Sequence, residues 1–256
     1  MVWPARKDMF YESLRNKFLH LVEKQSLSDT MITIRTHILK PNEAIGNPDR
    51  KDFPLLKGIE VLMQATFLDM KGQAYTDNPS EFSGPLREIT NLSLDDSRQK
   101  ALFIASLNAV MKYLNPDLLT VHCKNNEPEE CAEQIVSFIE TLHSRSAGII
   151  GLQPAILDAL AKTLGKENVS CIDRAEDNKN TVKYGVPIEW GDTKGTEDLF
   201  KKSDVVLATG SSAANGSLPD ILGIAQNYDS SLYFYGTTIV GTARLIGLNH
   251  LCFKAT

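Results

Sequence analysis

The densest group of side chains that could do chemistry lies in the segment from residue 120 to residue 131. It supplies two thiols, an imidazole and a carboxylate, at Cys123, Cys131, His122 and Glu127. Soft thiolate ligands combined with an imidazole favour a thiophilic transition-metal ion. The sequence therefore predicts a metal site whose candidate ligands are Cys123, His122 and Cys131.

A structural alternative for this segment stays open. A Cys-x7-Cys spacing is not one that structural zinc sites use. If His122 and Cys123 lie on a strand, they point to opposite faces, so only one of them can face a given site. The run Glu127-Pro128-Glu129-Glu130 has the acids and the proline typical of a helix start. Cys131 would then pack into the core as a small apolar side chain.

A second group of candidate residues follows apolar runs in the C-terminal half. Thr209-Gly210-Ser211-Ser212 and Gly236-Thr237-Thr238 place hydroxyl groups and glycines directly after two expected strands. Such loops present backbone N–H groups and hydroxyls to a ligand, although the same residues are common in turns and helix caps. Because two such loops follow neighbouring strands, we expect a small-molecule or anion site there. Its candidate residues are Thr209, Gly210, Ser211, Ser212, Asn215, Gly236, Thr237 and Thr238.

The segment Gly151-Leu152-Gln153-Pro154 joins an earlier apolar run to its helix. Proline suits the first position of a helix, and the N-terminus of that helix can hold an anion, so Gly151 and Gln153 are further candidates. The segment has one glycine where the dinucleotide-binding pattern GxGxxG has three, which disfavours NAD as a cofactor. Asp173 lies 22 residues beyond Gly151, where a nucleotide-binding fold places a ribose-binding acid. The alternative for Asp173 is a helix cap or a loop carboxylate.

An α/β fold must position these candidates. After residue 146, apolar runs alternate with helical stretches in the order βαβαβαβα, which is typical of a parallel sheet with helices on both faces. Ligands of such sheets bind at the carboxyl ends of the strands. The expected strands are 147–152, 168–173, 204–210 and 231–236, with an edge strand at 250–254, and the expected helices are 153–164, 196–202, 218–228 and 239–248.

The first half of the chain is predicted to be a smaller α+β domain. Helical spacing of apolar residues predicts helices at 7–24 and 94–114, and Asn108 lies inside the apolar run of the second helix. Alternating apolar residues predict strands at 31–39, 58–68 and 72–76. We therefore expect two domains, 1–115 and 116–256, with the boundary between residues 115 and 145.

Composition limits the classes of partner and compartment. The 256 residues are 42% hydrophobic and carry a formal net charge of −5, which argues against nucleic acid as a partner. No segment reaches the roughly 18 continuous apolar residues of a membrane span, and no apolar signal-peptide core is visible. We expect a cytoplasmic protein without a membrane partner. The four cysteines are too few for a disulfide scaffold, and Cys171 and Cys252, both in expected strands, are assigned to the core.

Six motifs spread over nearly the whole chain carry a resemblance to a known family. They are GQAYT at 72–76, ALFIASLNAVMKYL at 101–114, TVHCKNNEPEEC at 120–131, GLQPAIL at 151–157, TGSSAANGS at 209–217 and YGTTIVGTA at 235–243. The chain resembles an uncharacterised prokaryotic family that is named for heavy-metal chelation. The resemblance implies an N-terminal domain shaped like that of enolase, a Rossmann-like C-terminal domain and a cleft between them. It also implies that Asn108 and Glu127 belong to the site.

Three functions follow from these observations. The first is binding of a small molecule or a transition-metal ion in the cleft, including heavy-metal chelation or handling of a metal chelate. The second is a metal-free enzyme that acts on an anionic or nucleotide-like metabolite, held by loops of the kind described above. The third is a ligand sensor without catalysis. A homo-oligomer is also open, because an edge strand at 250–254 could pair with a second copy.

Overall fold

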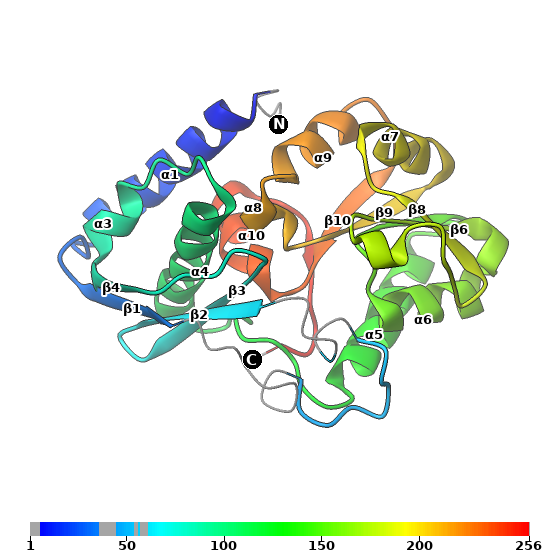
Figure 1. Cartoon of the computed structure of the whole chain (residues 1–256), viewed down its shortest axis with the longest axis horizontal. Coiled ribbons are helices and arrows are strands. Elements are labelled where there is room, and N and C mark those ends of the chain that lie inside the picture. The colour runs from blue at the N-terminus through cyan, green and yellow to red at the C-terminus, as the bar shows by residue number, and fades with distance from the viewer. Residues whose placement is uncertain (1–5, 36–44, 54–55, 57–60, 256) are drawn as a thin grey trace.

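The structure is a computed structural model that describes residues 6–35, 45–53, 56 and 61–255. Its strands form two separate sheets, which lie side by side (Figure 1). The four-stranded sheet has the order β3-β2-β1-β4, and the seven-stranded sheet has the order β11-β10-β9-β5-β6-β8-β7. The chain therefore has the predicted α/β fold.

The four-stranded sheet is built entirely from the first third of the chain. Its strands are β1 (Met31–Arg35), β2 (Val61–Phe67), β3 (Met70–Thr76) and β4 (Phe82–Pro85). All three pairings in this sheet are antiparallel. The strands predicted at 31–39, 58–68 and 72–76 correspond to β1, β2 and β3, and residues 36–39 and 58–60 lie outside the described residues.

Two helices predicted in the first half are confirmed. Helix α1 (Lys7–Lys24) has the predicted bounds, and a short helix, α3 (Leu86–Thr90), follows β4. Helix α4 (Ser97–Leu114) begins three residues after the predicted Leu94. Asp96 caps it, because its side chain accepts a hydrogen bond from the Gln99 N–H.

Helix α4 is the element that the two sheets share. Every residue from Ala101 to Met111 is buried, so this helix has no solvent face in that stretch. On one side it packs against β3, where a Cβ atom added at Gly72 would lie 2.1 Å from the Ala109 nitrogen. On the other side it contacts the helices that follow the second sheet's strands, and a Cβ atom added at Gly241 would lie 2.7 Å from Asn108 Oδ1. Glycines on both sides therefore permit the close approach.

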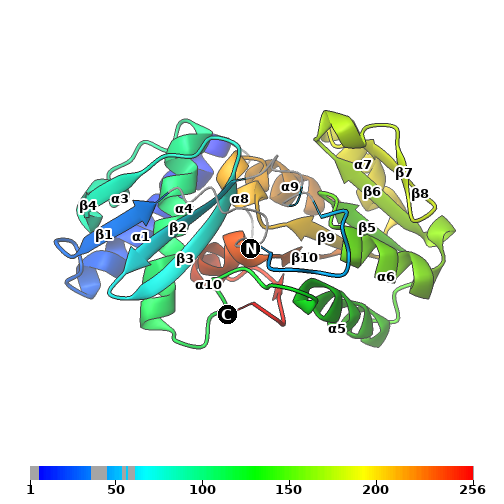
Figure 2. The ribbon, with the colours of Figure 1, turned by 60° about the horizontal axis from the view of Figure 1, so that its bottom comes forward.

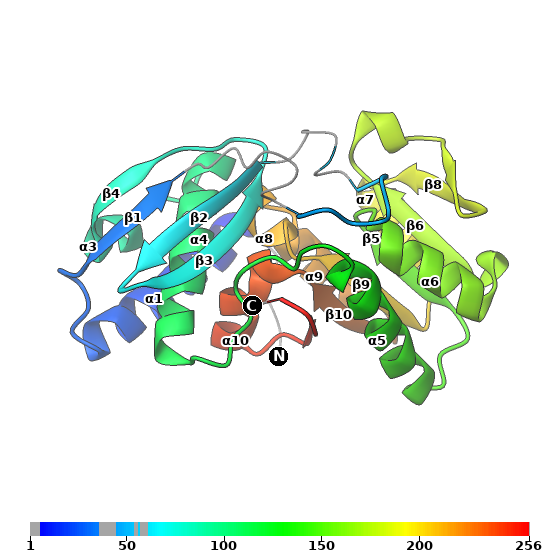
Figure 3. The ribbon, with the colours of Figure 1, turned by 90° about the horizontal axis from the view of Figure 1, so that it is seen from below.

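The seven-stranded sheet contains six parallel strands and one antiparallel edge strand. The parallel strands are β5 (Ala147–Ile150), β6 (Val169–Asp173), β8 (Val186–Trp190), β9 (Val205–Thr209), β10 (Ser231–Tyr235) and β11 (His250–Leu251). The edge strand is β7 (Val182–Lys183). Helices α5 (Glu127–Thr141) and α6 (Pro154–Leu164) cover one face, and α7 (Thr193–Lys202) and α9 (Leu218–Ala225) cover the other (Figures 1 and 3). The sheet is therefore wound on both sides, as predicted.

The sequence prediction missed β7 and β8. In β8 only alternate residues are buried, and Pro187 and Glu189 are exposed, so this strand lacks the continuous apolar run of a central strand. The edge strand predicted at 250–254 is also wrong in length, because β11 contains only His250 and Leu251. The helices predicted at 196–202, 218–228 and 239–248 are α7, α9 and α10 (Val240–Ile246), with shifted ends.

The parallel strands are added to the sheet first on one side of β5 and then on the other. From β5, the chain adds β6 and then β8 on one side, and it returns to add β9, β10 and β11 on the other side. This is the order of a doubly wound nucleotide-binding sheet, in which ligands bind at the carboxyl ends of the strands where the direction reverses. In this chain that point lies between β5 and β9.

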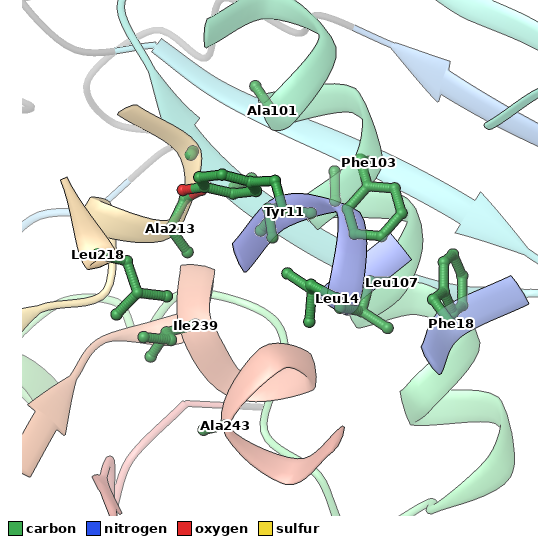
Figure 4. Packing of buried hydrophobic residues seen from close by; sticks show 14 of the residues in the cluster. Tyr11, Leu14, Phe18, Ala101, Phe103, Leu107, Ala213, Leu218, Ile239 and Ala243 are labelled. Atoms are coloured by element: carbon green, nitrogen blue, oxygen red, sulfur yellow. The ribbon is translucent and has the colours of Figure 1, made fainter. Parts of the chain in front are cut away.

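One hydrophobic cluster joins both sheets. Figure 4 shows Tyr11 and Leu14 of α1 near Leu107 of α4 and near residues that follow β9 and β10. The Tyr11 hydroxyl donates a 2.8 Å hydrogen bond to the Ala213 carbonyl in α8 (Ser212–Asn215). Figure 2 places α8 and α10 between the sheets. The predicted domain boundary between residues 115 and 145 stays a prediction, because segments on either side of it share this core.

Within the described part of the chain, no helix combines the length and the apolar character that crossing a membrane requires.

Candidate functional site

A cavity of about 310 Å³ lies at the carboxyl ends of the parallel strands, where their order reverses. Most of the predicted site residues line it: Gly151, Gln153, Asp173, Thr209, Gly210, Ser211, Asn215, Gly236, Thr237, Thr238, His122, Cys123 and Cys131. The other predicted residues, Asn108, Glu127 and Ser212, do not line it. The fold thus brings segments together that are far apart in the sequence.

The loop after β5 begins at Gly151, whose φ of +86° favours glycine. An added Cβ atom would also lie 2.7 Å from the Thr209 side chain. Helix α6 then begins with Pro154, which has no N–H, and Gln153 Oε1 accepts the Ile156 N–H at 2.6 Å. Two of the N–H groups that an anion would use at this helix start are therefore absent or occupied. This part of the cavity is a poor site for a pyrophosphate.

Asp173 ends β6 and holds two loops together. Its Oδ2 accepts the Leu152 N–H at 2.6 Å, and its Oδ1 accepts the Ala175 N–H at 2.7 Å and the Asn178 amide at 3.1 Å. Both carboxylate oxygens therefore already have protein donors. These contacts match the loop-carboxylate alternative, and a ribose hydroxyl would have to share Asp173 with them.

The loop after β9 presents two hydroxyl groups to the cavity. Thr209 Oγ1 and Ser211 Oγ are 3.0 Å apart and hydrogen-bonded. The Gly210 N–H donates to the Tyr235 carbonyl at 2.8 Å, which fixes the loop to β10. Ser212 is fully buried at the start of α8 and does not line the cavity.

The loop after β10 carries a buried hydroxyl without a hydrogen bond. Thr238 Oγ1 accepts the Tyr75 N–H at 3.0 Å, so this loop is tied to β3 of the other sheet. Thr237 is 2% exposed and lines the cavity, but its Oγ1 has no hydrogen-bond partner among the described residues. Ser212 and Thr242 share this property within the described chain, but neither lines the cavity.

Asn108 has a structural role in place of the predicted ligand contact. Its amide nitrogen donates to the carbonyls of Gln73, Thr237 and Thr238 at 2.8, 3.2 and 2.9 Å. Its Oδ1 accepts the Gly241 N–H at 2.7 Å. The four contacts join α4 to β3, to the loop after β10 and to α10, so both amide hydrogens of this fully buried side chain are used within the protein.

The predicted metal segment contributes a second wall of the cavity. Residues 120–126 do not form a strand, so the condition under which His122 and Cys123 would point to opposite faces is not met, and both line the cavity. Glu127 turns away, because its Oε2 accepts the Lys124 N–H at 2.6 Å. Cys131 lies in the first turns of α5 as the helix-start alternative predicted, but it is only half-buried.

Cys252 also lines this wall, although the sequence assigned it to the core. It follows β11 and is half-buried, whereas Cys171 is buried in β6 as predicted. A hydrogen bond from the Cys252 thiol is the main cause that lowers the pKa of Cys131 to about 7, against the opposing effect of burial. Burial raises the pKa of Cys123 to about 12, so this thiol stays protonated near neutral pH.

The predicted metal ligands do not fit a preformed metal centre. Among the residues that the structure describes, no three histidine, cysteine or acidic side chains converge as metal ligands. A structural or catalytic zinc ion requires at least three protein ligands. The segment from His122 to Cys131 would have to rearrange before it could hold such an ion.

Carboxylates and one guanidinium lie around the remaining rim. Asp192 accepts the Gly195 N–H at 2.7 Å, and Asp220 pairs with Lys7 at 2.6 Å. The exposed side chain of Arg174 donates from Nε to the Gly191 carbonyl at 2.9 Å. It places a positive charge among the residues that line the cavity. The described acids of the rim are thus all engaged by the protein.

The segment from residue 45 to residue 53 covers one side of the cavity with Ile45 and Phe53, which are both buried. In Figure 3 this blue segment crosses toward the seven-stranded sheet. Arg50 anchors it, because its guanidinium donates to the Asp158 carboxylate of α6 at 2.5 Å. Sequence reasoning missed this contribution, since nothing in the local pattern identifies a partner 108 residues away.

Comparison with known proteins supports the fold. No family model and no curated protein matches the chain. Among solved structures, it is similar to a DUF364 family protein of unknown function from Pyrococcus horikoshii, with a TM-score of 0.51 and 14% identity over 88% of this chain and 79% of that chain. A DUF364 family protein of unknown function from Desulfitobacterium hafniense gives a TM-score of 0.48 and 12% identity over 73% and 72%. The first likeness shows a shared α/β fold, and an uncharacterised family fits the chain.

Proposed function

We propose that the protein binds a small organic metabolite in the cavity between β5 and β9. The polar end of the ligand, such as a carboxylate or a phosphate, would contact the hydroxyls of Thr209, Ser211 and Thr237. The remainder would lie against the apolar wall that includes Ile45 and Phe53. This assignment joins a concave, largely apolar surface with a few polar groups, which is the usual composition of a ligand site.

The observation that carries the proposal is the Thr237 hydroxyl. A buried hydroxyl without a partner costs about 1 to 3 kcal/mol, so such groups are rare in native proteins. Thr237 lies in the wall of a cavity at the strand ends where ligands of this sheet type bind. A bound ligand would supply the hydrogen bond that the described residues do not.

The size and chemistry of the cavity favour one small metabolite over a dinucleotide. The volume of about 310 Å³ is at the low end of ligand pockets, which range from about 300 to 1,000 Å³. The start of α6, where a pyrophosphate would bind, is occupied by Pro154 and by the Gln153 cap. The loops after β9 and β10 are therefore the better place for an anionic group.

The test is a thermal-shift screen followed by calorimetry with the compound that gives the largest shift. The screen contains AMP, ATP, S-adenosylmethionine and small carboxylates such as citrate. A ligand present at 100 times its Kd adds about 2.7 kcal/mol to the free energy of unfolding. No stabilisation by any of these classes would argue against the proposal.

A matched pair of variants then tests the site itself. Thr237→Val removes the unpartnered hydroxyl, so the unliganded protein should be at least as stable as the wild type. Affinity for the compound from the screen should fall about tenfold, because one hydrogen bond of about 1.4 kcal/mol is lost. Thr242→Val removes a comparable buried hydroxyl outside the cavity and should leave affinity unchanged. Equal affinities for both variants would contradict the assignment of Thr237.

Metal handling is the second candidate function. The observation in its favour is that Cys123, His122 and Cys131 line one wall, next to the proposed ligand site. Their lack of convergence in the described structure weighs against a preformed centre. Titration of tag-free protein with zinc, iron, cobalt, nickel and copper tests it, and an unchanged result for Cys123→Ser would count against a role for that thiol.

A further inference from the structure

Two thiols that are 121 residues apart in the sequence meet at the cavity wall. Cys131 lies near the start of α5, and Cys252 lies directly after β11. Cys252 is bonded directly to Phe253, the residue whose backbone contacts the Cys131 sulfur. The Phe253 backbone N–H also donates to Cys131 Sγ at 3.5 Å. The C-terminal segment therefore contacts α5 at this sulfur atom.

Both thiols are accessible to a small reagent in the cavity. Each is half-buried, and each contributes to the same cavity lining as Cys123. Cys171 is the contrasting case, since it is 1% exposed in the middle of β6 and is not in the lining. Access and mutual contact are the two geometric conditions for disulfide exchange within a protein.

From this contact we propose that Cys131 and Cys252 form a redox-active dithiol, which exchanges with a low-molecular-weight disulfide and closes to an intramolecular disulfide. The inference goes beyond the proposed ligand binding and does not depend on it. It assigns a modification site to a pair of side chains that the metabolite proposal leaves unused.

The reaction balances as two thiol–disulfide exchanges. The Cys131 thiolate attacks one sulfur of the small disulfide, and the S–S bond breaks to release one small thiolate. The Cys252 thiol then loses its proton to solvent or to the released thiolate, and its sulfur attacks the Cys131 mixed disulfide. The second small thiol leaves. The protein dithiol is thus oxidised by two electrons, and the small disulfide is reduced to two thiols.

The surrounding groups divide the two roles between the thiols. The Phe253 N–H that donates to Cys131 Sγ would stabilise a thiolate on this sulfur. Lys254 is held near it by a 2.7 Å salt bridge to Glu130. The hydrogen bond to Cys131 and burial raise the pKa of Cys252. Cys131 is therefore the attacking sulfur, and Cys252 is the thiol that closes the bond.

The acids at the start of α5 act in two ways. Their negative charges disfavour a thiolate nearby, and Glu130 also holds Lys254 in place. Glu127, Glu129 and Glu130 belong to the first turns of α5 and lie near the thiols or near Lys254. Cys123, with its pKa raised by burial, remains a neutral neighbour.

The experiment uses the reduced protein and glutathione disulfide near pH 7.5. Intact mass and peptide mapping should show the loss of two hydrogen atoms and a Cys131–Cys252 bond, with two of the four thiols still open to alkylation after unfolding. A map that joins Cys123 to either cysteine, or a protein that keeps four thiols, would overturn the proposal. This measurement needs no variant, so it holds even where a substitution disturbs folding.

Variants separate the two steps. Cys252→Ser should trap one glutathione on Cys131, and Cys131→Ser should slow the consumption of glutathione disulfide at least tenfold. Cys171→Ala, at a buried thiol outside the cavity lining, should react as the wild type does. If Cys252→Ser traps no adduct, or if Cys131→Ser reacts at the wild-type rate, the assigned order of attack is wrong.

Discussion

Replacement of Asn108 by leucine should weaken the contact between the two sheets and lower the free energy of unfolding. Asn108 is fully buried in α4, and its amide joins β3 to the loop after β10 through four hydrogen bonds. Leucine has a similar size but neither a donor nor an acceptor. Asn108→Leu therefore deletes the polar contacts between α4 and both of its neighbours while it keeps most of the packing volume.

The expected cost follows from the four contacts. The Gly241 N–H is a buried donor that would lose its acceptor, which costs about 1 to 3 kcal/mol. The amide has two hydrogens to share among the three carbonyls, so these donations contribute about 1 to 3 kcal/mol together. The total is on the order of 2 to 6 kcal/mol, a large part of the roughly 5 to 15 kcal/mol that stabilises a typical domain.

Urea denaturation measures this loss. With a slope of about 3 kcal/mol per molar, the midpoint should fall by about 1 to 2 M. Ser106→Ala is the matched control, because Ser106 is also fully buried in α4 but bonds only to the Leu102 carbonyl of its own helix. A midpoint for Asn108→Leu equal to that of the control would refute the structural role. If Asn108→Leu keeps the stability of the wild type but loses ligand binding, the result would support the predicted contact between Asn108 and a ligand.

Two further perturbations follow from other contacts. Arg50→Met removes the contact to Asp158 and should lower the free energy of local opening of segment 45–53 by about 1.4 kcal/mol, so its amide hydrogens should exchange about tenfold faster. Lys51→Met, at an exposed neighbour, should leave the exchange rate unchanged. Equal exchange rates in the two variants would be contrary evidence. The Arg145 backbone N–H lowers the pKa of Asp204, so the stability that this carboxylate contributes is complete above its ordinary pKa and is lost as pH falls through the lowered value. Urea midpoints of wild type and Asp204→Asn should therefore differ at pH 7 and converge at low pH, and a constant difference would exclude the charge as the cause.

Periodicity predicted the elements better than it predicted their partners. The run from Ala101 to Met111 is apolar on all sides, which is typical of a helix buried all round. The pattern does not reveal that Asn108 in this run faces Gly241, because burial specifies no partner. Strand β8 was missed since its solvent-facing residues break the apolar run.

The candidate site was predictable where it depends on strand ends. Loops that follow parallel strands must meet at one edge, so Thr209 and Thr237 could be placed together from the sequence alone. Cys252 could not, because its neighbour Cys131 belongs to a helix on another part of the fold. The spacing of residues along the sequence does not predict which side chains meet through tertiary packing.

The hydrogen bond from Tyr11 to Ala213 has a consequence during synthesis. The partner of this hydroxyl emerges from the ribosome about 200 residues after it. Until then the apolar face of α1 and much of α4 lack the surfaces that bury them. The nascent chain therefore carries an incomplete core while these roughly 200 residues are translated, and exposed apolar surface favours aggregation and binding by chaperones. Slow translation of the codons between Tyr11 and Ala213 would lengthen that vulnerable interval.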